Sequence, residues 1–289
     1  MTWLVDEYIP ANTVTLISSV SGVGKSMVAL HLGICLLSGV DWLGNKCRQS
    51  VFAYWDQDNP DAWLTDNRII AIKRGLGLDI LLPAPIFRTK DRVLGHSANL
   101  IAMIQWLRDS GVTVLIVDTL ASVNPYSEGD PNAMARCIVD NFFPMVDAGI
   151  TPIILHHIGK DSTDNKGQTH RRKGIFAPRG STALVAACGA AFNLDKEKDI
   201  RSLECVKPRY GSPPILKIAY DEEGYLGSDD WRVTILNPER RESQASLTHF
   251  IRENDLTNVS SRKLVELLKL KGRVTTQSTA ARALSESRR

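Results

Sequence analysis

A glycine-rich segment between a predicted strand and a predicted helix restricts the fold of this chain more than any other feature. The apolar run TVTLIS, residues 13–18, predicts a buried strand, and residues 24–37 carry apolar side chains at helical spacing. The segment between them, SVSGVGKS, fits the phosphate-loop pattern G-x-x-x-x-G-K-[ST] in its last three positions and has Ser19 in place of the first glycine. A plain glycine turn is the alternative, but the Gly-Lys-Ser ending in this context favours a phosphate site.

The chemistry of such a loop suggests a function for each of its residues. Gly22 and Gly24 allow backbone N–H groups to curl around phosphates at the start of a helix, where the helix dipole attracts anions. Lys25 is expected to reach the β- and γ-phosphates of a nucleotide, and Ser26 is expected to hold Mg²⁺. The predicted nucleotide contacts are Ser21, Gly22, Val23, Gly24, Lys25, Ser26 and Met27.

The order of the remaining segments predicts an α/β fold with a mainly parallel central sheet. Apolar runs at 50–55, 112–117 and 151–155 alternate with helical patterns at 61–74, 97–110 and 133–147. Unbroken apolar strands that alternate with helices are typical of a parallel sheet covered on both faces. Two later runs, 203–207 and 215–220, predict an antiparallel hairpin at the sheet edge.

Composition excludes several classes of protein. The 289 residues carry a formal charge of +3, which excludes a wholly basic nucleic-acid coat protein but not a local basic patch. The five cysteines form no CxxC pair, so neither a disulfide framework nor a zinc site is indicated. The acidic N-terminus does not match a signal peptide, and no apolar stretch is long enough for a membrane span. We therefore expect a cytoplasmic protein without membrane contact.

Three acidic residues are candidates for the chemistry of a nucleotide site. Asp118 closes the run VTVLIV, at the end where a parallel sheet binds ligands, and is expected to support Mg²⁺ together with Ser26. A turn or helix-cap aspartate is the alternative. Asp56 and Asp58, in YWDQDNP, follow the second strand and are both candidates to orient or deprotonate the attacking water. Asp58 is also a candidate cap of the helix that follows.

A histidine pair and several basic residues complete the candidate site. His156 and His157 end the run TPIIL and must point to opposite faces of the strand, so a chelating pair is not indicated. The polar segment 159–178 predicts a long loop rich in Lys and Arg, which suits a DNA backbone. Arg179 opens a helical segment, and Lys207 and Arg209 lie at the hairpin tip. Solvated surface charges are the alternative for each of these cations.

The C-terminal segment predicts a separate small domain. We place an ATPase-sized core at 1–240, a linker at 238–243 and a tail at 241–289. The tail contains 10 Lys and Arg against 5 Asp and Glu. Residues 259–271 and 275–287 predict two helices around a turn, with Ser260 or Ser261 and Thr276 as N-caps. This pattern is equally consistent with duplex DNA binding and with a packed helical bundle.

Four motifs in a fixed order carry a resemblance to a known family. They are SVSGVGKS, YWDQDNP, LIVDTLAS, and HHIGK followed by RGSTAL. Through them the chain resembles, from about residue 4 to residue 225, the RecA-like ATPases of the RepA type, the small hexameric replicative helicases of plasmids and phages. The segment VKPRYG is also similar to the K-x-R-x-G segment of DnaB-type helicases.

The resemblance implies a function and a set of roles. It implies a RecA-like P-loop core that uses ATP and Mg²⁺ and assembles as a ring, usually a hexamer, around single-stranded DNA. His157 matches the sensor of the γ-phosphate, while Arg179, or Lys207 with Arg209, match fingers supplied to a neighbouring subunit. The family has Glu where this chain has Gln57, so Asp56 or Asp58 has taken over as the base, or hydrolysis is slow.

Two functions therefore follow from the sequence. The first is an ATP-hydrolysing DNA helicase or single-strand translocase of a plasmid or phage replication system. The alternative is a DNA-binding regulatory or recombination-mediator ATPase that does not unwind DNA. Gln57 and the helical tail favour the second, and the four ordered motifs favour the first.

Overall fold

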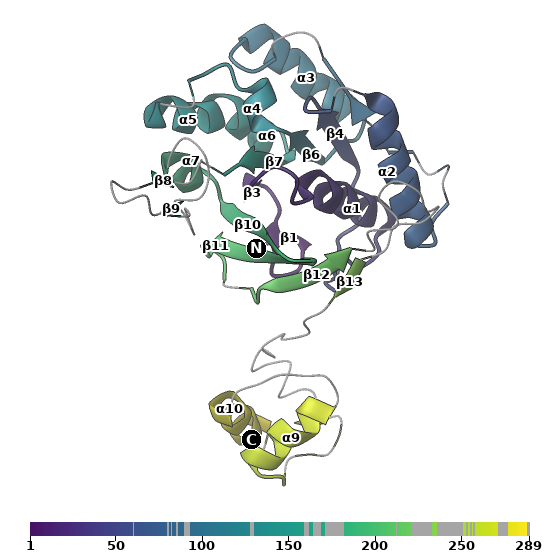
Figure 1. The fold of residues 1–289 in the computed structure, drawn as a ribbon, viewed down its shortest axis with the longest axis vertical. Helices are drawn as coiled ribbons and strands as arrows, with labels where there is room; N and C mark the ends of the chain where they lie inside the picture. The colour runs from purple at the N-terminus through teal and green to yellow at the C-terminus, as the bar shows by residue number, and fades with distance from the viewer. Residues whose placement is uncertain are drawn as a thin grey trace. The chain divides into compact units, whose positions relative to one another are not determined.

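The parallel strands predicted by the apolar runs form one twisted sheet in a computed structural model of the chain (Figure 1). The structure describes residues 1–59, 61–79, 81, 83–84, 86–89, 93–127, 130–158, 162–163, 169–170, 182–211, 213–220, 233–235, 251–252, 254, 256, 258–270 and 277–287. Most of the predicted basic loop 159–178, all of the predicted linker 238–243 and Arg179 lie outside these residues.

Within the described residues the strands form a nine-stranded sheet and two small two-stranded sheets. The strands are β1 (Trp3–Val5), β2 (Ile9–Pro10), β3 (Thr15–Ser19), β4 (Phe52–Asp56), β5 (Ile86–Phe87), β6 (Val114–Asp118), β7 (Thr151–His157), β8 (Ser162–Thr163), β9 (Thr169–His170), β10 (Ala190–Glu197), β11 (Ile200–Lys207), β12 (Leu216–Tyr220) and β13 (Val233–Ile235). The nine-stranded sheet has the order β13-β12-β11-β10-β3-β7-β6-β4-β5. All pairs from β10 to β5 are parallel, and β10 and β11 are antiparallel.

The helices lie where their apolar residues meet the two faces of this sheet. They are α1 (Lys25–Ser38), α2 (Ala62–Gly75), α3 (Ser97–Asp109), α4 (Leu120–Val123), α5 (Pro131–Cys137), the π-helical turn η1 (Ile138–Phe142), α6 (Phe143–Asp147) and α7 (Thr182–Ala187). Two further helices, α9 (Ser261–Leu270) and α10 (Gln277–Ser287), belong to the C-terminal segment. The predicted α/β fold with a mainly parallel sheet is confirmed.

Alternation along the strands assigns each side chain to one face. Odd-numbered residues of β4 and β6, such as Trp55 and Leu115, join the apolar residues of α3, α5 and α7 in one core cluster. The even-numbered residues of β4 and β6, among them Phe52, face the side on which α1 packs. The side chains of Asp56 and Asp118, which end these two strands, therefore share the face covered by α1.

Three expected elements differ from the structure. The helix predicted at 133–147 is divided into α5, η1 and α6, and Pro144 explains the division because it lacks the N–H that a continuous helix needs. Strand β10 was not predicted, because its Ala, Leu, Lys and Glu residues are helix formers and only pairing with β3 makes it a strand. Strands β11 and β12 are neighbours as predicted, but β13 lies outside them at the sheet edge.

The chain divides into two compact units, one of residues 1–213 and 217–234 and one of residues 214–216 and 235–289. In the second unit α9 and α10 pack through a small apolar cluster of Ile251, Leu264, Ala280, Ala283 and Leu284. The Oγ of Ser260 accepts a hydrogen bond from the Lys263 N–H at 3.2 Å, which confirms Ser260 as the N-cap of α9. Thr276 lies outside the described residues. No helix in the described part of the chain is both long and apolar enough to span a membrane.

A close approach between α1 and β4 generates a test of this packing. A Cβ added at Gly33 would lie 2.6 Å from the ring of Phe52, which is completely buried. Overpacking costs about 1–3 kcal/mol, whereas Gly→Ala in a helix gains up to about 1 kcal/mol. We therefore expect Gly33→Ala to lower the free energy of unfolding, as measured by urea denaturation.

The double variant Gly33→Ala with Phe52→Leu is the control, because the shorter side chain makes room for the new methyl group. Its loss of stability should be smaller than the sum of the two single losses. Strict additivity would contradict the proposed contact.

Candidate functional site

The ends of four parallel strands bring most of the predicted site residues to one edge of the sheet. The register pairs Ser19 of β3 with His157 of β7, and Asp56 of β4 with Asp118 of β6. Because β3, β7, β6 and β4 are consecutive and parallel, their carboxyl ends share an edge, where α/β sheets bind ligands. The phosphate loop and the acidic residues, which the sequence predicts to belong to one site, therefore meet at this edge.

The phosphate loop has the backbone conformation that its glycines permit. Gly22 and Gly24 have φ angles of 79° and 103°, in the region that side chains other than glycine rarely adopt. Gly24 is the N-cap residue of α1, and the first turn of α1 contains no acidic residue. Ser21 and Gly22 are exposed, whereas Val23 and Met27 are buried. The start of α1 is therefore open to an anion and is not neutralised by its own side chains.

Lys25 lies buried under this loop and contacts the residue that departs from the motif. Its Nζ donates to Ser19 Oγ at 3.0 Å, and to the carbonyl oxygens of Ser19 and Val20 at 3.3 Å each. Burial lowers the pKa of Lys25, while the charges of Asp118 and Asp58 raise it. Ser19 thus supplies a hydroxyl acceptor for the lysine where the motif has glycine, which explains how the loop accommodates the departure.

Asp118 provides an oxygen suited to a hard cation. Its Oδ2 accepts from the Tyr54 hydroxyl at 2.6 Å, and its carboxylate also forms a hydrogen bond with the Ser26 side chain. Burial raises the pKa of Asp118, and these two hydrogen bonds lower it. Its Oδ1 is buried and has no hydrogen-bond partner among the described residues. Such a carboxylate oxygen beside a serine hydroxyl fits the few protein ligands that Mg²⁺ uses when phosphates supply the rest.

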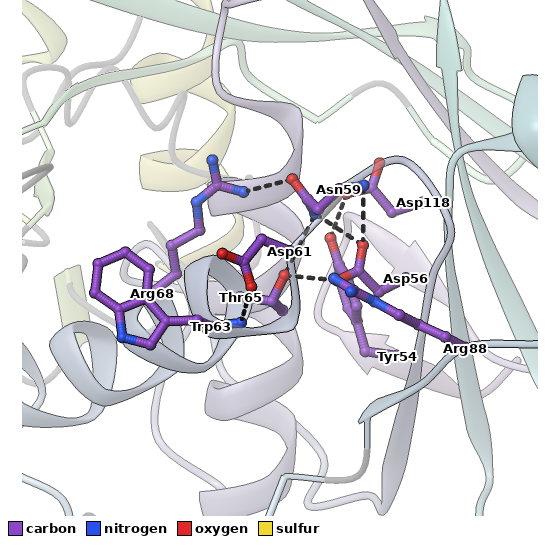
Figure 2. A network of polar contacts seen from close by, with 9 residues as sticks. All are labelled: Tyr54, Asp56, Asn59, Asp61, Trp63, Thr65, Arg68, Arg88 and Asp118. Carbon is purple, nitrogen blue, oxygen red and sulfur yellow. Dashed lines mark hydrogen bonds and ion pairs between the residues drawn. The ribbon is translucent and has the colours of Figure 1, made fainter.

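Asp56 is the centre of a polar network that fixes the loop after β4 (Figure 2). Its fully buried carboxylate forms an ion pair with Arg88 at 2.7 Å and accepts hydrogen bonds from Thr65 Oγ1 at 2.6 Å and Asn59 Nδ2 at 2.8 Å. Arg68 in turn donates to Asn59 Oδ1 at 3.3 Å. The carboxylate of Asp56 is therefore fully engaged with protein groups, as expected of an anchor rather than of a group that meets water.

Asp58 has the opposite environment. Its side chain is exposed, its Oδ1 accepts from Ser122 Oγ at 3.2 Å, and its charge acts on both Lys25 and Asp118. The helix cap predicted at Asp58 is wrong, because Asp61 caps α2 by accepting from the Trp63 N–H at 2.9 Å.

Two backbone hydrogen bonds hold this loop against β6. The N–H groups of Gln57 and Asp58 donate to the Asp118 carbonyl at 2.8 and 3.1 Å. The side-chain amide of Gln57 is turned away to the Thr89 carbonyl, 2.5 Å distant. Of the three side chains at 56–58, Asp58 is the one that an incoming water can reach.

The histidines separate as predicted. His156 is completely buried, on the face with Ile154 in the core cluster, and His157 is half-buried on the opposite face, toward α1. The position of His157 beside Ser19 is consistent with a phosphate sensor.

The two hairpin cations lie at the other edge of the sheet. Lys207 pairs with Ala191 near the amino end of β10, and Ala191 pairs with Leu16 near the amino end of β3. The Lys207 ammonium donates to the carbonyl oxygens of Val185 at 2.8 Å, Ala186 at 2.6 Å and Cys188 at 2.5 Å, so it closes the end of α7. Arg209 is exposed. Neither cation is near its own phosphate loop.

Comparison with known proteins agrees with this geometry. The family described as AAA domain matches residues 1–163, more than half of the 289 residues. The chain belongs to the AAA-domain family. Among solved structures it is similar to the ATPase domain of a helicase, with a TM-score of 0.53 and 14% identity over 76% of this chain and 84% of that one. The RadB recombinase matches with a TM-score of 0.48 and 17% identity over 74% and 90% of the two chains. No curated protein sequence matches.

These matches identify a RecA-like fold and a P-loop ATPase of the AAA-domain family. Sequence reasoning missed four side chains of the site, namely Tyr54, Thr65, Arg88 and Arg201. Tyr54 was accessible in principle, because strand alternation places it on the same face as Asp56. Arg88 and Arg201 follow or begin strands whose bounds the sequence did not predict, so nothing indicated that they approach the site.

The contacts of Lys207 predict that its main contribution is to stability. Lys207→Met keeps the aliphatic stem and leaves three helix-end carbonyls without their donor, and hydrogen bonds to charged groups contribute about 1.5–3 kcal/mol. We expect a loss of about 2 kcal/mol in the free energy of unfolding. Arg209→Ala, two residues away and exposed, is the matched control and should unfold at the wild-type denaturant midpoint. Equal stability of Lys207→Met and wild type would contradict the capping role.

Proposed function

We propose that this AAA-family ATPase hydrolyses ATP in a ring of identical subunits and acts as a DNA helicase or single-strand translocase of the RepA type. The observation that carries the proposal is the meeting of Lys25, the Ser26–Asp118 pair and exposed Asp58 at one edge of the sheet. This set contains the parts that phosphoryl transfer from ATP to water needs, namely a phosphate cradle, a Mg²⁺ position and a carboxylate open to water.

In the proposed reaction each residue of the chain has a separate task. The phosphate loop binds the β- and γ-phosphates through its N–H groups, and Lys25 moves from Ser19 to neutralise their charge. Ser26 and the Oδ1 of Asp118 hold Mg²⁺, which when bound draws charge from the phosphate oxygens. Asp58 accepts the proton of the attacking water, and His157 senses the γ-phosphate.

Assembly into a ring follows from the position of the candidate fingers. The turn that carries Arg209 lies at the sheet edge opposite the phosphate loop of the same chain. Arg209 is therefore proposed to act on the nucleotide of a neighbouring subunit, and Arg179 stays a second candidate for this role. Lys207 is not a candidate in its present contacts, because its three donors are occupied by α7. Six subunits is the number that the resemblance to RepA-type rings implies.

The proposed DNA contacts rest on charge. The basic loop 159–178 is proposed to follow the backbone of a single strand in the ring channel, which needs cations rather than base readout. The tail is proposed to contact duplex DNA through its excess of Lys and Arg. Fold similarity to a helicase ATPase domain supports the motor function and carries no information about the DNA.

A second candidate function is a DNA-binding regulatory or recombination-mediator ATPase that does not unwind DNA. The observation that favours it is the orientation of Gln57, whose amide is bound to Thr89 and is not available to orient water. Slow hydrolysis is sufficient for a switch but not for a motor.

The two carboxylates after β4 give the sharpest test of the catalytic proposal. Asp58→Asn removes the proposed base without disturbing a buried group, and general-base catalysis contributes about 10²–10⁴-fold to rate. We expect turnover to fall about 100-fold, with ATP binding retained. The Asp56→Asn variant instead breaks a buried ion pair, so we expect lower stability but turnover per folded molecule within about tenfold of wild type.

Steady-state phosphate release, corrected for the folded fraction, measures both effects, and Lys25→Ala is the reference for a lost phosphate site. If Asp56→Asn is the slower of the two when folded, the assignment of the base is wrong. Turnover of Lys25→Ala at the wild-type rate would remove the phosphate-loop assignment itself.

Motor and switch are separated by strand displacement on a forked DNA duplex. The helicase proposal predicts that single-stranded DNA stimulates ATP hydrolysis and that the wild-type chain displaces a strand, whereas Lys25→Ala does not. Duplex binding without displacement would support the regulatory alternative. Electron microscopy with a non-hydrolysable ATP analogue tests the assembly, because closed rings are expected and open filaments would indicate the mediator.

A further inference from the structure

The hairpin of β10 and β11 extends past the end of β3 and lies over the side of the phosphate loop. Asn193 of β10 pairs with Ser18 of β3, and β10 then continues to Glu197 before the chain turns back into β11. Ile200 and Arg201, the first residues of β11, pair with Glu197 and Lys196. The start of β11 is therefore level with the loop that follows Ser19, two strand positions away.

One side chain of this hairpin contacts the loop directly. Arg201 is 6% exposed, and its Nε donates to the carbonyl oxygen of Val23 at 3.0 Å. A second donor of the same guanidinium, Nη1, contacts the Asp199 carbonyl at 3.3 Å, which ties the side chain to its own turn. Arg201 is thus held by the hairpin at one point and holds the phosphate loop at another.

The position of this contact within the loop gives it a consequence for the phosphates. A peptide unit is planar and trans, so the Val23 carbonyl and the Gly24 N–H point in opposite directions. Once Arg201 fixes the carbonyl on the hairpin side, the Gly24 N–H must point away from the hairpin. Gly22 and Gly24, with φ angles of 79° and 103°, lie on either side of Val23, and glycines resist a change of peptide orientation less than other residues do.

We infer that Arg201 is a positioning residue for nucleotide binding, which acts through the Val23–Gly24 peptide and orders the phosphate loop before ATP arrives. The inference rests on the proposed ATPase function and adds a residue from outside all of its motifs. The loop would otherwise have to be ordered by the nucleotide at the expense of affinity. The role of Arg201 is therefore predicted to appear in binding, whereas that of Asp58 appears in the chemical step.

The test uses three variants of the full chain. Arg201→Gln removes the charge and shortens the reach to Val23, Arg201→Lys keeps a cationic donor, and Lys198→Asn is the control. Lys198 is exposed in the turn of the same hairpin at a φ of 54°, which asparagine tolerates, so this control removes a cation without touching Val23. Calorimetry gives the Kd for ATP and for inorganic tripolyphosphate, which contacts only the phosphate side of a nucleotide site. Steady-state kinetics give KM and kcat.

We expect Arg201→Gln to raise the Kd for ATP and for tripolyphosphate by the same factor, about tenfold, with kcat within about threefold of wild type. Arg201→Lys should recover part of the loss, and Lys198→Asn should bind like wild type. Should Arg201→Gln fail to fold, Arg201→Lys decides the question, because it must still weaken both ligands relative to Lys198→Asn.

Wild-type affinity in the Arg201 variants overturns the inference, and so does a loss confined to kcat. A loss of ATP affinity with unchanged tripolyphosphate affinity also overturns it, because the effect would then lie outside the phosphate loop. Failure of the wild-type chain to bind ATP is a different result, which rejects the proposed function itself.

Discussion

The parallel pairing of β3, β7, β6 and β4 is the constraint on which the rest of the site depends. Parallel strands place all their carboxyl ends at one edge, so a loop after residue 19, an acidic segment after residue 56 and Asp118 meet although they are far apart in sequence. The alternation of side chains then selects the face. Asp56, Asp118 and Tyr54 all lie on the side of α1, the helix that begins with Lys25 and Ser26.

Within this arrangement the two neighbouring aspartates divide the work by burial. The carboxylate of Asp56 is surrounded by Arg88, Thr65 and Asn59, which compensate the loss of water that a buried charge requires. The same network fixes the loop, so that Asp58, two residues later, faces outward beside Lys25. A pair of acids that looks redundant in sequence is thus one anchor and one exposed group, in agreement with the way environment sets the role of a carboxylate.

The sequence was sufficient for the features that depend on local order and insufficient for those that depend on distant contacts. Strand–helix alternation predicted the sheet, and the Gly-Lys-Ser motif predicted the start of α1 to within one residue. The choice between Asp56 and Asp58 required Arg88, which comes 32 residues after Asp56 and follows the unpredicted short strand β5. Strand β10 was missed because its residues favour a helix, and the contact of Arg201 with Val23, 178 residues apart in the chain, was missed with it.

Strand β11 has a geometric property that neither of its ends reveals alone. Arg201, its second residue, contacts the phosphate loop, and Lys207, its last, contacts the end of α7, with Arg209 just beyond. The stretch between Arg201 and Lys207 spans about 20 Å of extended backbone, which is hydrogen-bonded to β10 along its length. Such a strand transmits displacement like a stiff rod. In a head-to-tail assembly, a shift of one subunit's phosphate loop would therefore move the very turn that this subunit presents to the next nucleotide, without any hinge between the two.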